Sequence, residues 1–175
     1  DKQIIVAEAL LDNFIKECEI KSFKKLEKFK GKDFKNTICN HPFLDLGYEH
    51  DIPMLEANFV TTEQGTGIVH CAPSHGPDDL NLCLNNGIKA IETVDGDGKY
   101  TKNVLLFEGI HIFKANPLVI EKLKEQKKLL KNSELVHSYP HSWRSKAPLV
   151  HRATPQWFIS MESRKLRYKA LKAIE

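Results

Sequence analysis

Residues 65–80, with the sequence GTGIVHCAPSHGPDDL, combine side chains that can recognise a charged small molecule. His70 follows two apolar residues at the expected end of a strand, and Asp79 lies in the predicted first turn of a helix. Between them, Pro73 and the pair Gly76–Pro77 restrict the loop backbone. The pattern predicts that an imidazole and a carboxylate meet at one rim. There the carboxylate could bind an ammonium group while the imidazole shapes the pocket wall.

Each of these residues also has a purely structural interpretation. A carboxylate in the first turn stabilises a helix by a few tenths to about 1 kcal/mol, so Asp79 could serve the helix alone, although Asp78 could do the same. His70 could be a core histidine whose ring is satisfied by the backbone. The sequence Gly65-Thr66-Gly67 could be a turn that needs a flexible backbone. The chain contains no glycine-rich phosphate-binding motif.

The four cysteines form no Cys-x-x-Cys pair. No signal peptide and no apolar run long enough to span a membrane is present, so the cysteine usage indicates a reduced, cytosolic protein with free thiols and no membrane partner. A zinc site is an alternative, although the spacing matches no standard ligand pattern. Its ligands would be Cys39, His41, Cys71 and His75.

Hydrophobic periodicity predicts a mixed α+β fold. Helices are expected over residues 7–18, 77–85 and 116–130, with a further helical pattern over 164–175. A tight turn is expected at Asp95–Gly98. Strands are expected over residues 3–6, 53–61, 67–72, 88–94, 109–113, 134–139 and 155–161. Many short strands with non-adjacent helices favour a barrel or an α+β domain over a doubly wound sheet.

The positive charge is concentrated in two runs, residues 16–35 and 164–172, although the net charge is only +3. Either run could face a polyanion, whereas a solvated lysine-rich face is the commoner arrangement. The length of 175 residues suits one domain, or one domain plus a piece of its neighbour. Because the sequence starts without Met in a strand pattern and stops in a helical one, we expect a piece of a longer polypeptide.

Two long motifs, GTGIVHCAPSHGPDD and HSYPHSWRSKAPLVHRATPQWFISM, carry a family resemblance. With IIVAEALL, HPFLDLGYEHDIP and GIHIFKAN, they cover nearly the whole chain. The sequence resembles the editing insertion of isoleucyl-tRNA synthetases, called connective polypeptide 1. The related valyl and leucyl synthetases share the GTG and a later Asp, but not this His followed by GPDD. That difference favours the isoleucyl family, and an editing domain of the valyl or leucyl type is the alternative.

The resemblance implies a β-barrel editing-domain core with peripheral helices, which hydrolyses mischarged valyl-tRNA(Ile) by water attack on the aminoacyl ester. Asp79 matches the family residue that binds the substrate α-amino group, and His70 matches the one that lines the side-chain pocket. Both are the expected catalytic residues. Gly65, Thr66 and Gly67 match the pocket loop. No metal or cofactor is expected in this segment, whereas the full-length enzymes use ATP and Mg.

The resemblance also implies a division of the chain and a set of partners. Residues 1–139 are expected to form the editing domain, truncated at its N-terminal side, and residues 140–175 the return toward the synthetic domain. The family's threonine-rich strand lies upstream of this sequence, so the segment alone is expected to hydrolyse its substrate poorly. Expected partners are the tRNA(Ile) 3′ acceptor end, valine as its ester and the remainder of the synthetase, in the cytoplasm. A non-catalytic module that binds the tRNA acceptor through lysines, Trp143, Arg144 and Trp157 is the alternative from a different class.

Overall fold

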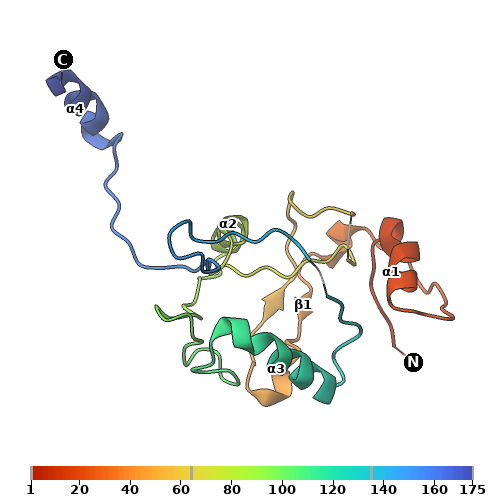
Figure 1. Ribbon diagram of the computed structural model, residues 1–175. Helices are drawn as coiled ribbons and strands as arrows, with labels where there is room; N and C mark the ends of the chain where they lie inside the picture. The colour runs from red at the N-terminus through yellow and green to blue at the C-terminus, as the bar shows by residue number, and fades with distance from the viewer. Residues whose placement is uncertain (1, 64, 135, 175) are drawn as a thin grey trace.

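A computed structural model describes residues 2–63, 65–134 and 136–174 of the chain. Helices and two short strands are separated by long stretches of irregular backbone (Figure 1). The helices are α1 (Leu11–Glu17), α2 (Pro77–Asn85), α3 (Ile112–Glu125) and α4 (Leu166–Ile174), and the strands are β1 (Ile38–Cys39) and β2 (Ile52–Pro53). Single 3-10 turns are η1 (Glu8–Leu10), η2 (Gly31–Phe34), η3 (Leu44–Leu46) and η4 (Ser163–Lys165). The predicted mixed α+β character is therefore confirmed.

Helix α2 has the bounds that local signals predict. Pro77 occupies the first helical position, where no backbone N–H is needed and its fixed φ suits the helix. Asp78 and Asp79 lie in the first turn, where negative charge complements the helix dipole. Gly87 follows the last turn with φ of +75°, a left-handed conformation that glycine adopts readily.

Helix α3 begins at Ile112, ahead of the predicted cap at Asn116. His111 caps the helix instead, because its Nδ1 accepts a hydrogen bond from the N–H of Phe113 at 3.3 Å. Pro117 consequently lies inside the helix, where it removes one backbone hydrogen bond. Among the described residues, no helix combines the length and the apolar character that crossing a membrane requires.

Strands β1 and β2 form the one sheet assigned among the described residues. They run antiparallel, with Ile38 opposite Pro53 and Cys39 opposite Ile52. The closed β-barrel implied by the family resemblance is therefore wrong for this part of the chain. In a barrel every strand is hydrogen-bonded on both edges, whereas here two strands of two residues each pair on a single edge.

Most of the other predicted strands are extended or irregular segments without a hydrogen-bonded ladder. Residues 3–6, 67–72, 88–94 and 155–161 have no assigned strand, nor do the described residues of 134–139, where Leu135 lies outside the description. In 109–113 the last two residues belong to α3, and in 53–61 only the first residue is in a strand. These predictions failed because β-propensity reflects packing in a sheet, and the pairing partner is supplied by distant residues.

The tight turn predicted at Asp95–Gly98 is confirmed. Oδ1 of Asp95 accepts hydrogen bonds from the backbone N–H groups of Asp97 and Lys99, each at 2.9 Å. An antiparallel bridge between Val94 and Tyr100 closes the turn. A short carboxylate that bonds its own backbone in this way is a local signal, which explains why the sequence predicted the turn.

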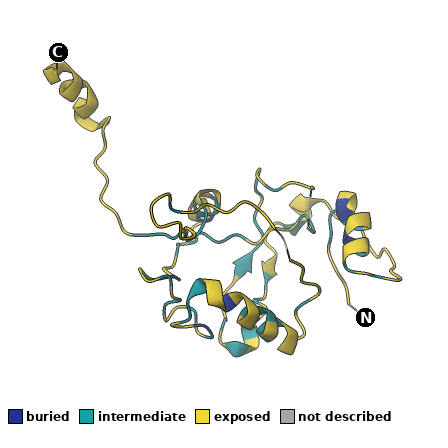
Figure 2. Ribbon diagram, viewed as in Figure 1, coloured by how far each residue is buried: buried dark blue, intermediate teal, exposed yellow. Residues whose placement is uncertain are grey.

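The buried side chains are few and lie in separate groups (Figure 2). Leu10 and Phe14 are buried on η1 and α1. The rings of Phe43 and Phe107 pack together with centroids 6.3 Å apart. The buried apolar residues of the described chain are Leu10, Phe14, Phe43, Cys83, Val94, Phe107 and Ala115. The core is therefore formed mainly by loops and helix faces rather than by a sheet.

Residues 154–174, here called the tail, lead away from the rest of the chain and include α4 (Figure 1). The helical pattern predicted at this end is confirmed by α4. Upstream of the helix, Trp157 is fully exposed and Phe158 is 86% exposed. Arg167 forms an ion pair with Glu162 at 2.6 Å. The tail is thus organised by contacts within itself.

Candidate functional site

The loop of residues 71–76 folds over the carboxylate of Asp79. The N–H of Ala72 donates a hydrogen bond to Oδ2 of Asp79 at 2.8 Å. A Cβ atom added at Gly76, the cap of α2, would lie 3.3 Å from the same oxygen. Asp79 is half-buried, whereas Asp78 is exposed. The two neighbouring carboxylates therefore differ in environment, and only Asp79 fixes the loop.

The Gly65-Thr66-Gly67 sequence forms a turn against the N-terminal segment. Both glycines have positive φ, +70° at Gly65 and +81° at Gly67, so the turn interpretation is confirmed. The N–H of Ala7 donates to the carbonyl oxygen of Thr66 at 2.7 Å. A Cβ on Gly67 would lie 2.7 Å from Cβ of Ala7, a distance that real side chains do not adopt. The turn is therefore held in place by the backbone that leads into η1.

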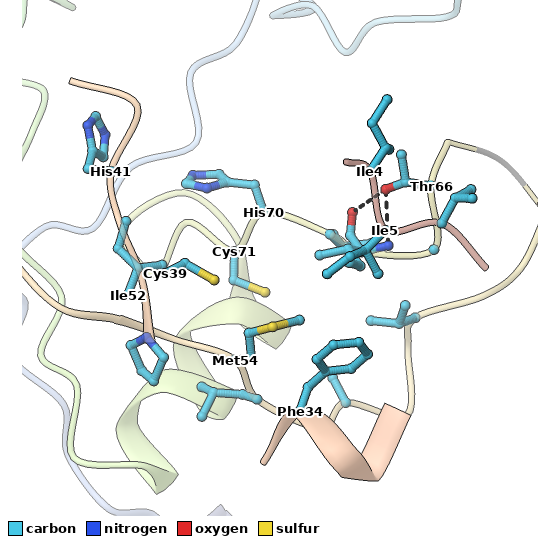
Figure 3. Close-up of a pocket in the computed structure, with 18 of the residues that line it drawn as sticks. Ile4, Ile5, Phe34, Cys39, His41, Ile52, Met54, Thr66, His70 and Cys71 are labelled. Atoms are coloured by element: carbon cyan, nitrogen blue, oxygen red, sulfur yellow. Dashed lines mark hydrogen bonds between the residues drawn. The ribbon is translucent and has the colours of Figure 1, made fainter. Parts of the chain in front are cut away.

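A wide hollow of about 2510 Å³ lies beside these loops (Figure 3). His41 and His70 lie toward one end of the view, and Thr66 and Ile5 toward the other. Apolar side chains such as Met54 and Phe34 cover the wall between them. Small-molecule pockets usually enclose about 300–1,000 Å³. This hollow is larger than an amino-acid ester requires, so selection by size needs a group that projects into it.

Three rings, those of His41, Tyr48 and His50, lie together at one end of the hollow. The His41 ring stacks on Tyr48, with centroids 4.5 Å apart and planes 12° apart, and the His50 ring lies 5.4 Å from His41. Burial lowers the pKa of His41, and the nearby His50 and His70 lower it further. The N–H of Phe43 donates to Nδ1 of His41 at 3.0 Å, so the neutral ring carries its proton on Nε2. A neutral imidazole whose Nε2 carries the proton is therefore placed near His70.

Sequence reasoning missed the grouping of His41 with Tyr48, His50 and His70, because it considered His41 only as a zinc ligand. The available signal was local: the HPF tripeptide at 41–43 followed closely by the YEH tripeptide at 48–50. Imidazole and aromatic rings at such short spacing tend to stack when a turn brings them together. Nothing in the sequence pattern, however, places His41 near His70.

The thiols of the site are held protonated. Burial raises the pKa of Cys71, and the charge of Asp79 raises it further. Burial and then Asp79 likewise raise the pKa of Cys83. The reactive form of cysteine is the thiolate, so neither residue has the environment of a catalytic nucleophile.

The alternative zinc site does not form in the part of the chain that the structure describes, where no group of three or more His, Cys, Asp or Glu residues is arranged to hold a metal ion. His75 could not serve as a ligand, because both of its ring nitrogens have other partners. Nδ1 bonds the carbonyl oxygen of His151 and Nε2 bonds Oγ1 of Thr93, each at 2.8 Å.

The hollow brings together only some of the predicted site residues. Thr66, Gly67 and His70 line it, whereas Gly65 and Asp79 do not. No hydrogen bond or ion pair between described residues joins His70 to Asp79. Ala72 lines the hollow and also donates to Asp79, so the carboxylate lies directly behind this wall. The shared role of His70 and Asp79 at one site stays a prediction.

Comparison with known families decides the class of this domain. A sequence model described as leucyl-tRNA synthetase, editing domain, matches residues 2–135. The chain belongs to this editing-domain family. The matched residues include the turn at Gly65–Gly67, the wall residue His70 and the carboxylate of Asp79. The family resemblance that the GTGIVHCAPSHGPDD motif indicated is confirmed.

Isoleucine--tRNA ligases resemble this editing-domain chain along its full length. The chain is 82% identical over 175 residues to isoleucine--tRNA ligase of Pelagibacter ubique (strain HTCC1062), covering 100% of the chain and 19% of that protein. The corresponding enzyme of Gluconobacter oxydans (strain 621H) is 44% identical over 99% of the chain and 19% of its own length. That of Haemophilus ducreyi is 43% identical over 100% of the chain and 18% of its length. The chain thus spans about a fifth of the length of the curated relatives it matches, and the predicted resemblance to isoleucyl-tRNA synthetases is confirmed.

Proposed function

We propose that this chain is the editing segment of an isoleucine--tRNA ligase and hydrolyses mischarged valyl-tRNA(Ile). The observation that carries the proposal is the 82% identity, across all 175 residues, to a protein named isoleucine--tRNA ligase. Membership of the editing-domain family supports the hydrolytic part. In this proposal, the hollow lined by Thr66, Gly67 and His70 receives the aminoacyl end of the tRNA.

The reaction needs no nucleophile from the protein, because an aminoacyl ester is already reactive toward water. The water oxygen attacks the ester carbonyl carbon, and the carbonyl oxygen becomes an oxyanion. When the intermediate collapses, the bond to the ribose oxygen breaks, and that oxygen takes up the proton released by water. The products are free valine and tRNA(Ile). The site contributes by holding water and ester together and by stabilising the oxyanion. The protonated thiols of Cys71 and Cys83 agree with water as the nucleophile.

Asp79 is proposed to bind the ammonium group of the esterified valine. A charge-assisted hydrogen bond to a carboxylate is about twice as strong as a neutral one. Oδ2 already accepts from Ala72, so in this proposal the ammonium group is bound by Oδ1. Because Ala72 also lines the hollow, an ammonium group at Oδ1 would hold the ester next to that wall.

His70 is proposed to exclude isoleucine. Valine lacks one methylene of isoleucine, and burying a methylene contributes only about 0.8 kcal/mol, so attraction alone separates the two poorly. Forcing an extra methylene against a packed wall typically costs about 1–3 kcal/mol. The imidazole of His70, with His41 close to it, would provide such a wall.

The proposal extends to the partners. The tRNA acceptor end would approach basic and aromatic side chains such as Trp143, which is 78% exposed and has the guanidinium of Arg144 5.1 Å from its ring centroid. Residues 140–175 would lead back to the synthetic part of the ligase, where ATP and Mg are used, and the enzyme would work in the cytoplasm. Binding through several phosphates would weaken as salt rises.

The test is to exchange residues 1–175 into the Pelagibacter ubique ligase in place of the matching segment, and to measure the hydrolysis of valyl-tRNA(Ile) and isoleucyl-tRNA(Ile). We expect the exchanged ligase to cleave the valyl ester and to spare the isoleucyl ester. The His70→Ala ligase should cleave both esters. The control His137→Ala ligase, changed at an exposed position outside the hollow, should still cleave the valyl ester and spare the isoleucyl ester. A stable valyl-tRNA(Ile) in the presence of the exchanged ligase, but not of the parent ligase, would refute the proposal.

A second candidate is a tRNA-acceptor-binding module without chemistry. It is favoured by one observation, the exposure of Trp143 and Trp157, because bases that stack on aromatic side chains contribute about 1–3 kcal/mol each. The same exchanged ligase separates the two functions. A module of this kind would bind tRNA without hydrolysing valyl-tRNA(Ile), and alanine at either tryptophan would weaken that binding.

A further inference from the structure

Three segments far apart in the sequence meet at the loop that covers Asp79. They are Ser74–His75 in the loop, residues 91–94, and His151–Ala153 near the start of the tail. The N–H of Ala153 donates to the carbonyl oxygen of Ser74 at 2.8 Å. Arg152 forms an ion pair with Glu92 at 3.5 Å, and its Nη1 lies 3.5 Å from the carbonyl oxygen of Val94. We call residues 151–153 the clasp.

The ring of His75 joins all three segments. Nδ1 faces the carbonyl oxygen of His151, which can only accept, so Nδ1 carries a proton and donates. In the neutral ring, Nε2 then accepts from the hydroxyl of Thr93. Beside it, the hydroxyl of Ser74 donates to the carbonyl oxygen of Ile91, and Ser74 is buried. Both nitrogens of His75 are therefore occupied, which fixes the orientation of the ring.

The backbone of the loop transmits this fixed position to Asp79. The N–H of His75 donates to the carbonyl oxygen of Ala72 at 2.9 Å, and the N–H of Ala72 donates to Oδ2 of Asp79 at 2.8 Å. Asp79 is thus two hydrogen bonds away from His75 and one further bond away from the clasp. The family match ends at residue 135, so the clasp lies outside the matched region.

We propose that the clasp, acting through His75, positions the 71–76 loop and with it the carboxylate of Asp79 for the aminoacyl ester. His75 lines the hollow, but both of its ring nitrogens are bonded to other parts of the protein, so we treat it as a positioning residue. The inference rests on the proposed editing function. A displacement of about 1 Å at a reacting group can cost about 100-fold in rate, so a modest shift of the loop would affect hydrolysis strongly.

Two variants with amide side chains of similar shape separate the hydrogen bonds made by the two ring nitrogens of His75. His75→Asn places an amide N–H near the position of Nδ1 and can keep the bond to the clasp. His75→Gln places its amide near the position of Nε2 and can keep the bond to Thr93, but it loses the bond to the carbonyl oxygen of His151 in the clasp. His75→Phe fills the same space and loses both bonds. Thr93→Val is the matched control, because it removes only the hydroxyl partner of Nε2 and preserves the shape of the side chain.

The variants are made in the exchanged Pelagibacter ubique ligase, and kcat and KM are measured for valyl-tRNA(Ile) hydrolysis. We expect His75→Phe and His75→Gln to lower kcat about tenfold or more, with KM changing less than about threefold, because positioning acts on the reacting geometry. His75→Asn and Thr93→Val should stay within about threefold of the parent. Aminoacylation with isoleucine should be equal in all of them, which shows that the synthetic part of the ligase is intact in each variant.

Amide hydrogen exchange provides a readout that does not depend on activity. The amides of Ala72 and Ala153 should exchange faster in His75→Gln and His75→Phe than in the parent and in His75→Asn. A His75→Phe variant with the parent kcat and unchanged exchange would overturn the inference, as would equal losses in His75→Asn and His75→Gln. Absence of valyl-tRNA(Ile) hydrolysis in the unmodified exchanged ligase is a different result: it rejects the proposed function and the catalytic role of His75 with it, while the exchange rates still decide whether the clasp holds the loop.

Discussion

The clasp and the tail follow one another directly in the sequence but differ in how they are held. Residues 151–153 bond to the loop over Asp79 and to residues 92 and 94. The hydrogen bonds found for residues 154–174 join residues of the tail to one another, as between Gln156 and Thr154 or between Arg167 and Glu162. The change in packing between these two regions therefore falls at Ala153, while the expected domain boundary near residue 140 stays a prediction.

The difference shows that hydropathy alone did not decide which part of this segment packs. The clasp has the polar sequence His-Arg-Ala, yet it is bonded to two other parts of the chain, the loop over Asp79 and residues 92–94. Residues 155–161 are more apolar and were predicted as a strand, yet Trp157 and Phe158 are exposed. An apolar segment packs only where a partner surface meets it, whereas backbone and side-chain hydrogen bonds can fix a polar segment against a loop.

The largest expected difference between the packed region and the tail is in stability. Phe107 is 7% exposed and packs against Phe43, whereas Phe158 is 86% exposed. Phe107→Ala should lower the free energy of unfolding by about 3–5 kcal/mol, because it leaves a cavity. The matched change Phe158→Ala should lower it by less than about 0.5 kcal/mol. Urea titration of the chain measures both, and similar losses for the two variants would break the comparison.

A somewhat smaller effect is expected on activity in the loop that the clasp holds. Asp79→Asn keeps an oxygen that can accept from Ala72 but removes the charge that would bind the ammonium group. In the exchanged ligase, valyl-tRNA(Ile) hydrolysis should fall by about 100-fold, the order expected for losing a charged partner of the substrate. Asp78→Asn, at the exposed neighbour, should stay within about threefold of the parent. Equal losses would assign both carboxylates to the helix dipole instead.

The smallest expected effect is a pH dependence of the free energy of unfolding. It sharpens the comparison because the titrating residue, His41, lines the hollow and is not in the tail. The pKa of His41 is lowered from its ordinary value of 6.5 by burial, then by His50 and His70. As pH falls below 6.5, His41 binds a proton in the unfolded chain before it does so in the folded chain. The contribution of His41 to the free energy of unfolding is therefore complete above pH 6.5, and it is lost as pH falls to the lowered pKa of the folded state. The free energy of unfolding should therefore decline more steeply on acidification in the parent than in His41→Gln. Identical slopes at pH values between 7.5 and 5.5 would contradict the assignment to His41.

Local signals in the sequence predicted the helices and one turn. Pro77, the two following Asp residues and Gly87 gave helix α2 its bounds, and Asp95 predicted its own turn. The exception is α3, which is capped by His111 and not by Asn116, the residue predicted because histidine is a less common capping residue than asparagine. The predictions of a barrel and of most strands were wrong, because strand pairing depends on residues that are distant in sequence.

In the candidate site, too, local features were predictable from the sequence and contacts between distant residues were not. The turn at Gly65–Gly67 and the place of Asp79 in the first turn of α2 were predictable from residue types. The bonds of His75 were not, because its partners Thr93 and His151 are 18 and 76 residues away. The sequence motif also does not tell that the carboxylate of Asp79 is turned toward Ala72, behind the wall of the hollow.

The contact between Ala7 and Gly67 constrains any redesign of this pocket for a different ester. With only 2.7 Å between the Ala7 methyl group and the position of a Cβ at Gly67, and φ of +81° at the glycine, the two positions behave as one unit. A combinatorial library over the loop should keep both residues fixed. Diversity is better placed at Thr66 and Ile68, whose side chains are not enclosed, since Thr66 is half-buried and Ile68 exposed. An engineer who varies the whole motif uniformly would lose most clones to backbone strain before any substrate is tested.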